Sequence, residues 1–455
     1  MRIYESETVN CSLKSQKGHI FKHDDIKHIY ICPEVFELII EGAVKILWPN
    51  REGESFYIKD VFPLLQSKNL VNEGLSIGWP ATSMCQGIMF FSEYKSEAPS
   101  SFLFHAIDDC GGRYREIRLL ADDCNKLRIR FSGKQCRWEF VERSRSVAFD
   151  CAKNKKLAEQ SFMFQVGFKD SEGTSIPDTN FGILPDLAKR FSQIVGKNTS
   201  SEKPSIIHLF GYGAGHDVGY PDYTPADDLG GSDGLCKAAD EIHEKRFLLS
   251  CYLNARLVQV ELIEKFPELM SSRCVTADGT YVIERYGNHE FFVMNPCSAI
   301  WEEYLFEQAI MLKSCGADAV QLDQVAGRAP AVSVGEEWGR GYKALINRLH
   351  AEGLKVWIQG VSDYYPADWF EMTYRELSIL PGGVLRGGTP FGKTDLCLLK
   401  ALMPDDEKDR CFIVPLKKAP LIKDSGLSII VDLLTMDGSP PFYGKDYLDK
   451  LSSLI

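Results

Sequence analysis

The chain lacks several patterns that would assign it to a class at once. No apolar run approaches the roughly 18 residues of a membrane span, and the first residues lack the apolar core of a signal peptide. There is no C-x-x-C pair, no H-x-H or H-E-x-x-H arrangement, and no G-x-G-x-x-G between a strand and a helix. We therefore expect no membrane span, no catalytic metal, no cofactor and a cytoplasmic location.

Positive charge is also scarce. Lys and Arg number 52 against 63 Asp and Glu, which gives a net charge of −11. Such an acidic chain is a poor candidate for nucleic-acid binding through a broad basic face. With 455 residues, 44% hydrophobic and 25% charged, it has the composition of a folded globular protein of two domains.

The 14 cysteines all stand singly. Disulfide bonds would require an oxidising compartment, which no export signal supports. We expect free thiols that serve as small core residues, in preference to a redox or metal site.

Residues 1–170 have the pattern of a β domain. Short aromatic or β-branched runs, separated by Gly, Asn, Asp and Ser, recur at near-regular spacing, for example at residues 36–49, 87–94, 101–107, 115–123, 126–133 and 161–168. This spacing predicts an antiparallel β-sandwich. Residues 171–204 read as a linker with one short amphipathic helix over 184–195, because Leu184, Leu187, Phe191 and Ile194 are spaced three or four apart.

Residues 205–455 alternate between strands and helices. We predict strands at 205–212, 246–257, 317–324 and 354–360, and helices at 232–246, 298–316 and 333–353. The alternation predicts a parallel sheet with crossover helices, and about 250 residues suit a (β/α)8 barrel. A doubly wound open sheet is the alternative, disfavoured because the dinucleotide fingerprint is missing.

Active sites of parallel barrels lie at the carboxyl ends of the strands. Polar residues follow the predicted strands at these ends: His216, Asp217, Tyr220, Asn254, Arg256, Asp323, Gln324, Gln359 and Asp363. Asp323 closes an apolar strand and is either a catalytic carboxylate or the cap of the next segment.

A retaining glycosidase needs a carboxylate nucleophile and a carboxylic acid about 5 Å apart. Asp323 fits the first role. Asp363, Glu371 and Glu376 are candidates for the second, although each alone is more often a surface carboxylate. His216 and Asp217 could bind sugar hydroxyls or form a loop turn. Tyr212, Tyr220, Tyr223 and Trp357 could stack on a sugar, whereas Trp301 and Trp338 lie on apolar helix faces and suit the core.

Three segments resemble the barrel of glycoside-hydrolase-like proteins related to the α-galactosidase and α-amylase superfamily of retaining α-glycosidases. They are HLFGYGAGHDVGYPDYTPADDLGG, CYLNARLV and GADAVQLDQ. Residues 78–94 with 102–112 also resemble the β-sandwich of that family. The resemblance implies that G-H-D follows the first strand, that Y-x-N lies on the second and that L-D-Q ends the fourth.

Carried over, the resemblance implies Asp323 as nucleophile, His216 and Asp217 as ligands of the sugar hydroxyls, and Asn254 as a lining residue. One departure is Gln359, which stands where amylase-like members carry a general-acid Glu, and an amide cannot supply that proton. Asp363, and then Glu376, are the replacements we consider.

We therefore predict a two-domain glycoside hydrolase that cleaves an α-linked glycoside, an oligo- or polysaccharide, with retention through Asp323. The substrate-binding residues would be His216, Asp217, Tyr220, Asn254, Arg256, Gln324, Trp357 and Gln359. A transglycosidase or glycan-processing enzyme of a surface-polysaccharide pathway is one alternative. A carbohydrate-binding protein without activity is another, and the sugar, the linkage and the oligomeric state stay open.

Overall fold

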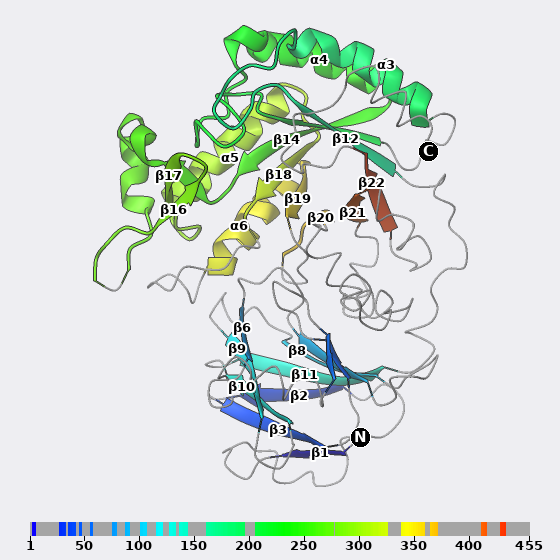
Figure 1. Cartoon of the computed structure of the whole chain (residues 1–455), viewed down its shortest axis with the longest axis vertical. Helices are drawn as coiled ribbons and strands as arrows, with labels where there is room; N and C mark the ends of the chain where they lie inside the picture. The colour runs from blue at the N-terminus through cyan, green and yellow to red at the C-terminus, as the bar shows by residue number, and fades with distance from the viewer. Residues whose placement is uncertain are drawn as a thin grey trace.

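The computed structural model (Figure 1) describes residues 161–195, 205–276, 278–325, 338–359, 365–371, 411–415 and 428–433, and the backbone of eleven strands before residue 144. All statements below about absence refer to these residues. None of the helices among them is both long enough and apolar enough to span a membrane.

The first eleven strands form two antiparallel sheets. One has the order β1-β3-β10-β9-β6 and the other β2-β11-β8-β7-β4-β5. Their bounds are β1 Arg2–Glu5, β2 Lys27–Cys32, β3 Val35–Glu41, β4 Lys45–Leu47, β5 Ser55–Tyr57, β6 Leu75–Trp79, β7 Gly87–Phe91, β8 Ser101–Ala106, β9 Arg115–Ala121, β10 Leu127–Ser132 and β11 Cys136–Arg143. The β character of this region agrees with the sequence pattern, while the face-to-face sandwich stays a prediction.

Eight parallel strands close into a barrel in the order in which they follow along the chain. They are β12 Ser161–Gly167, β13 Ser205–Phe210, β14 Phe247–Asn254, β18 Ala319–Asp323, β19 Lys355–Gln359, β20 Trp369–Glu371, β21 Cys411–Pro415 and β22 Ser428–Asp432. The ring closes because β12 pairs with β22, with Ser161 opposite Ile430. This closure excludes the doubly wound open sheet. The sequence also carries a G-x-x-x-x-G-K-T pattern at residues 387–394, which lies outside the described residues.

The barrel begins earlier than the sequence pattern indicates. We assigned residues 161–167 to the first domain and 171–204 to a linker, but β12 pairs in parallel with β13, and α3 (Leu184–Val195) connects the two strands. Every residue of β12 is buried, so its sequence shows no period that would distinguish it from a sandwich strand. In consequence β13 is the second barrel strand and β14 the third, not the first and second. The strand that ends in Asp323 remains the fourth.

The predicted helices are present. The structure has α3 with the predicted bounds, α4 at Gly231–Glu244, α5 at Ala299–Ser314 and α6 at Trp338–Ala351; the expected start of α6 at Ser333 lies outside the described residues. Trp301 and Trp338 are fully buried between helices and barrel, which confirms their place in the core. β21 lies in a segment for which we predicted no element.

Side chains that point into the barrel form an apolar layer with a polar layer above it. The apolar layer contains Met163, Ile206, Ala319, Trp357, Trp369, Ile413 and Ile430. In the polar layer His208 Nδ1 lies 3.0 Å from Ser250 Oγ, which also accepts a 2.8 Å hydrogen bond from the Trp357 indole. Burial lowers the pKa of His208 to about 3, so the barrel interior holds a neutral imidazole.

None of the five cysteines whose side chains the structure describes forms a disulfide bond. Cys251, Cys274 and Cys315 are buried, and Cys236 and Cys297 are half-buried. The three buried ones fill core positions as small apolar groups, as the sequence analysis predicted.

Helix α6 packs so closely on the segment before α5 that one position admits only glycine. A methyl group on Gly341 would lie 2.1 Å from the carbonyl oxygen of Pro296. One on Gly234 in α4 would make only ordinary van der Waals contacts, with the Phe181 ring at 3.6 Å and the Leu229 carbonyl oxygen at 3.9 Å. We expect Gly341→Ala to lower the free energy of unfolding by ~1–3 kcal/mol, because backbone must move. Gly234→Ala should leave stability unchanged or raise it by up to ~1 kcal/mol. Urea unfolding of both variants measures this, and equal stabilities would contradict the packing described.

Candidate active site

Asp323 ends β18 at the carboxyl mouth of the barrel, level with Asn254 on β14. Its carboxylate accepts two hydrogen bonds: Oδ2 from the Tyr252 hydroxyl at 2.8 Å, and Oδ1 from the backbone N–H of Gln324 at 2.8 Å. Gln324 has a φ of 62°, a left-handed conformation that costs an L-residue roughly 1–2 kcal/mol. Asp323 is therefore a partly buried carboxylate held in one orientation at the end of a strand.

The surroundings of Asp323 favour its protonated form. Burial raises its pKa, and the negative charge of Asp217 adds to the rise. The hydrogen bonds from Tyr252 and Gln324, and the charge of His216, work in the opposite direction without cancelling the burial effect. A carboxylate that is desolvated yet ionisable is a stronger nucleophile or base than one in water.

A chain of polar contacts extends from Asp323 through two tyrosines to the loop after β13. The Tyr220 hydroxyl lies 3.0 Å from that of Tyr252, and it also donates to the backbone carbonyl of His216. The His216 ring stands 5.0 Å from Phe210 and 5.4 Å from Tyr252, with its Nε2 4.0 Å from Asp217 Oδ1. Tyr212, Tyr220 and Tyr223 are nearly fully buried, so these rings support the site and are not open to a sugar.

The Asn254 side chain forms hydrogen bonds with the backbone that follows β14. Its Oδ1 accepts 3.0 Å hydrogen bonds from the N–H groups of Arg256 and Leu257, and its Nδ2 lies 3.4 Å from the Tyr252 hydroxyl. The Tyr223 hydroxyl contacts both the N–H and the carbonyl of Asn254. Asn254 thus turns the chain at the end of β14 and helps to orient Tyr252.

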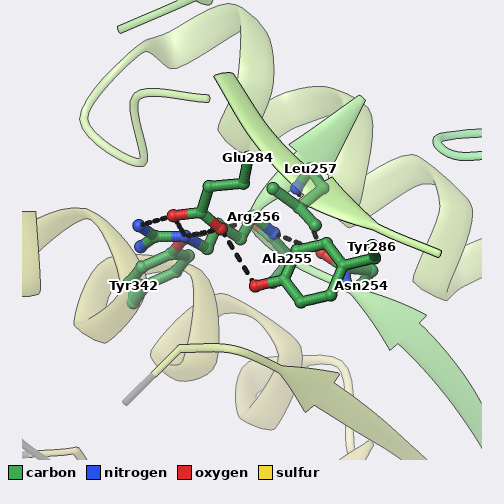
Figure 2. Close-up of polar contacts among 7 residues, drawn as sticks. All are labelled: Asn254, Ala255, Arg256, Leu257, Glu284, Tyr286 and Tyr342. Carbon is green, nitrogen blue, oxygen red and sulfur yellow. Dashed lines mark hydrogen bonds and ion pairs between the residues drawn. The ribbon is translucent and has the colours of Figure 1, made fainter. Parts of the chain in front are cut away.

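Arg256 is engaged with Glu284 (Figure 2). Its Nη2 lies 2.6 Å from Glu284 Oε1, its Nε 3.2 Å from both carboxylate oxygens, and its guanidinium 5.0 Å from the Trp338 ring. Glu284 belongs to β16 (Ile283–Tyr286), which pairs with β17 (His289–Val293) and, through it, with β15 (Leu257–Gln259). The buried Nη1 of Arg256 has no hydrogen-bond partner in the described chain. Arg256, which we expected to contact substrate directly, therefore also anchors this small sheet to the barrel.

The remaining predicted residues lie in different surroundings. Trp357, expected to stack on a sugar, is buried in the barrel interior with its ring edge-on to His208 at 4.7 Å, so protein already covers it. Gln359 is exposed at the end of β19, opposite Glu371, which ends β20. Asp363 and Glu376 lie outside the described residues.

Two residues that matter here were missing from our predicted site. Tyr252 donates to Asp323, and the alternation of polar side chains at Ser250, Tyr252 and Asn254 along β14 could have indicated it. Glu284 lies 28 residues from its partner Arg256, and no local pattern links the two.

No protein-family model and no curated protein matches the sequence. Solved structures do match. An α-N-acetylgalactosaminidase, NagBb from Bifidobacterium bifidum in complex with GalNAc, is similar with a TM-score of 0.59 and 13% identity, covering 94% of this chain and 77% of that one. The α-galactosidase TtGalA from Thermus thermophilus is similar with a TM-score of 0.55 and 11% identity, covering 94% of this chain and 88% of that one. AgaB, an α-galactosidase from Geobacillus stearothermophilus, is similar with a TM-score of 0.56 and 10% identity, covering 94% of this chain and 63% of that one. At these identities the likeness establishes the fold.

The hydrogen bond from Tyr252 leads to a prediction about ionisation. Tyr252→Phe removes a donor that stabilises the charged carboxylate, so the pKa of Asp323, already raised, should rise further. Carboxyl ¹³C NMR titration, with Asp323→Asn to identify the resonance, measures it. Tyr212→Phe is the control, because that hydroxyl donates to the Tyr252 carbonyl and does not reach Asp323. An unchanged or lower pKa in Tyr252→Phe would contradict this assignment.

Proposed function

We propose that the chain is a glycoside hydrolase that cleaves an α-linked glycoside with retention of configuration. The observation that carries the proposal is Asp323, a partly buried carboxylate fixed by two hydrogen bonds at the carboxyl end of the fourth strand of a parallel barrel. The fold is shared with an α-N-acetylgalactosaminidase and α-galactosidases, which favours an α-linked sugar of galactose configuration as the first substrate to test.

The proposed reaction has two displacements. A carboxylate oxygen of Asp323 bonds to the anomeric carbon while the glycosidic C–O bond breaks, and the leaving oxygen takes a proton from a general acid. Water then attacks the same carbon, gives its proton to the deprotonated acid residue, and releases Asp323. Tyr252 and the Gln324 N–H hold Asp323 in the attacking orientation, each leaving a lone pair on its acceptor oxygen free.

His216 and Asp217, on the loop beside Tyr252, are the groups we assign to the hydroxyls of the sugar being cleaved. His216 supports this because its Nδ1 is buried and has no partner in the described chain. For the general acid, Asp363, Glu371 and Glu376 remain our candidates, and Glu371 ends β20 opposite Gln359. A transglycosidase would use the same first step with a sugar hydroxyl in place of water.

The nucleophile assignment predicts a specific loss and rescue. We expect Asp323→Gly to lower kcat/KM on an α-galactosyl fluoride by ~10³-fold or more, since no covalent intermediate can form. Added azide should restore turnover and give a β-galactosyl azide, because the small anion attacks from the vacated side. An unchanged melting temperature controls for folding. Wild-type rates in the variant would refute the role, and saturable sugar binding by an inert wild-type chain would favour the binding-protein alternative.

The general acid can be identified by its dependence on the leaving group. Fluoride departs with little proton donation, whereas an alkyl or sugar alkoxide needs it. Among Asp363→Ala, Glu371→Ala and Glu376→Ala, we expect one variant to keep the wild-type kcat/KM on the glycosyl fluoride, because kcat/KM reports only the first displacement. The same variant should lose ~10²–10⁴-fold in kcat/KM on an unactivated glycoside. Steady-state kinetics with the two substrates distinguishes them. Selective loss in none of the three would place the acid elsewhere.

A further inference from the structure

The segment between β14 and α5 carries most of the exposed large apolar side chains that the structure describes. Of five such residues, Met270, Tyr281, Ile283 and Tyr286 lie within residues 255–298, and the fifth, Ile300, follows directly. This segment forms the small sheet of β15, β17 and β16, which Figure 1 shows beside the barrel, away from α3 and α4. Exposed apolar side chains that gather on one segment indicate a contact surface.

The two faces of this sheet have different surroundings. Phe291 and Phe292 are consecutive in β17 and therefore point to opposite faces. Phe292 lies against Tyr281 at 5.6 Å and under the Arg273 guanidinium at 4.8 Å. Phe291 lies against Tyr286 at 6.1 Å and against Tyr220 of the active-site loop at 5.7 Å. Only the face with Phe291 and Tyr286 is turned toward the barrel mouth.

A continuous set of contacts joins that face to Asp323. From Phe291 the path runs to the Tyr220 ring, then to the Tyr252 hydroxyl and the Asp323 carboxylate. A second set of contacts runs through Glu284, which binds Arg256. Arg256 lies two residues beyond Asn254, which ends β14 level with Asp323. The negative charge of Asp323 also contributes to the raised pKa of Tyr286, which places the two groups within electrostatic reach.

Tyr286 is exposed and yet held in place. Its side chain is 40% exposed, while its hydroxyl donates to Glu284 Oε2 at 3.1 Å and Glu284 is in turn fixed by Arg256 (Figure 2). Burial and the Glu284 charge raise the pKa of Tyr286 to about 12, so the phenol is neutral. The turn of the hairpin is tied down where His289 Nε2 lies 3.2 Å from Glu172 Oε2. An immobile aromatic ring loses little entropy on binding a ligand.

We propose that Tyr286 and Glu284 form the subsite for the leaving group, and that this leaving group is itself a sugar. The inference rests on the proposed function and adds the residues that would bind the leaving sugar of the oligosaccharide expected from the sequence, in place of a glycoside with a small alcohol. A pyranose offers an apolar C–H face to the Tyr286 ring and hydroxyls that donate to the half-buried Glu284 carboxylate. An ion-pair partner already neutralises Glu284, so a neutral sugar suits the pair better than a cationic ligand.

The test compares two substrates that share the cleaved sugar. An α-galactosyl fluoride has no leaving-group atoms that reach Tyr286, whereas an α-galactosyl disaccharide or trisaccharide does. We expect Tyr286→Ala to lower kcat/KM on the oligosaccharide by ~10-fold and to change the fluoride rate by less than ~2-fold, because one aromatic contact is lost. Tyr286→Phe should retain most of the oligosaccharide rate. Tyr281→Ala is the matched control, since Tyr281 is 45% exposed on the opposite face.

The outcomes separate the two proposals. If the wild-type chain hydrolyses no glycosyl fluoride, the proposed function fails, and the subsite with it. If the wild type is active but Tyr286→Ala loses both substrates equally, or neither, or no more than Tyr281→Ala, the function stands and the leaving-group subsite is refuted. Selective loss on the oligosaccharide, absent from Tyr281→Ala, supports it.

Discussion

The pairing of β12 with β22 is the contact on which the arrangement of the barrel depends. A parallel sheet that did not close would leave two rows of backbone N–H and C=O groups unpaired. Closure also fixes where the strands end, because eight parallel strands bring their carboxyl ends to one mouth. Asn254, Asp323, Gln359 and Glu371 are separated by up to 117 positions and yet stand at successive strand ends around it.

Below that mouth the barrel interior holds a layer of polar side chains. Burial keeps His208 neutral, and its Nδ1 lies 3.0 Å from Ser250 Oγ, which also accepts a hydrogen bond from the Trp357 indole. In the same interior the buried Asp432 carboxylate accepts a 2.8 Å hydrogen bond from Gln165. Above this layer Asp323 interacts electrostatically with His216 and Asp217. Burial is the main cause of the raised pKa of Asp323, and the hydrogen bonds from Tyr252 and Gln324 oppose it without cancelling it.

Local sequence patterns were sufficient to predict part of the barrel and of the candidate site. The apolar strand that ends in Asp323 and the three-and-four spacing of helix 184–195 are short-range signals, and both predictions agree with the structure. The role of residues 161–167 was not predictable in the same way, because a fully buried strand has the same composition in a sandwich and in a barrel, and its partners lie far along the chain. The interior position of Trp357 and the pairing of Arg256 with Glu284 likewise depend on contacts made only after the chain has folded.

Helix α6 connects two parts of the molecule that otherwise have separate roles. It follows the strand that carries Asp323, and its first turns pack against the residues that flank the small sheet. Trp338 lies under the Arg256 guanidinium, and the Tyr342 hydroxyl donates to the Ala255 carbonyl. Gly341 packs against the Pro296 backbone. On the other face of β16, Ile283 and Arg285 are exposed, and Arg285 forms an ion pair with Glu290 of β17. Substitutions at these two positions can therefore change the surface beside the barrel mouth without repacking α6 and without moving Asp323 at the end of β18.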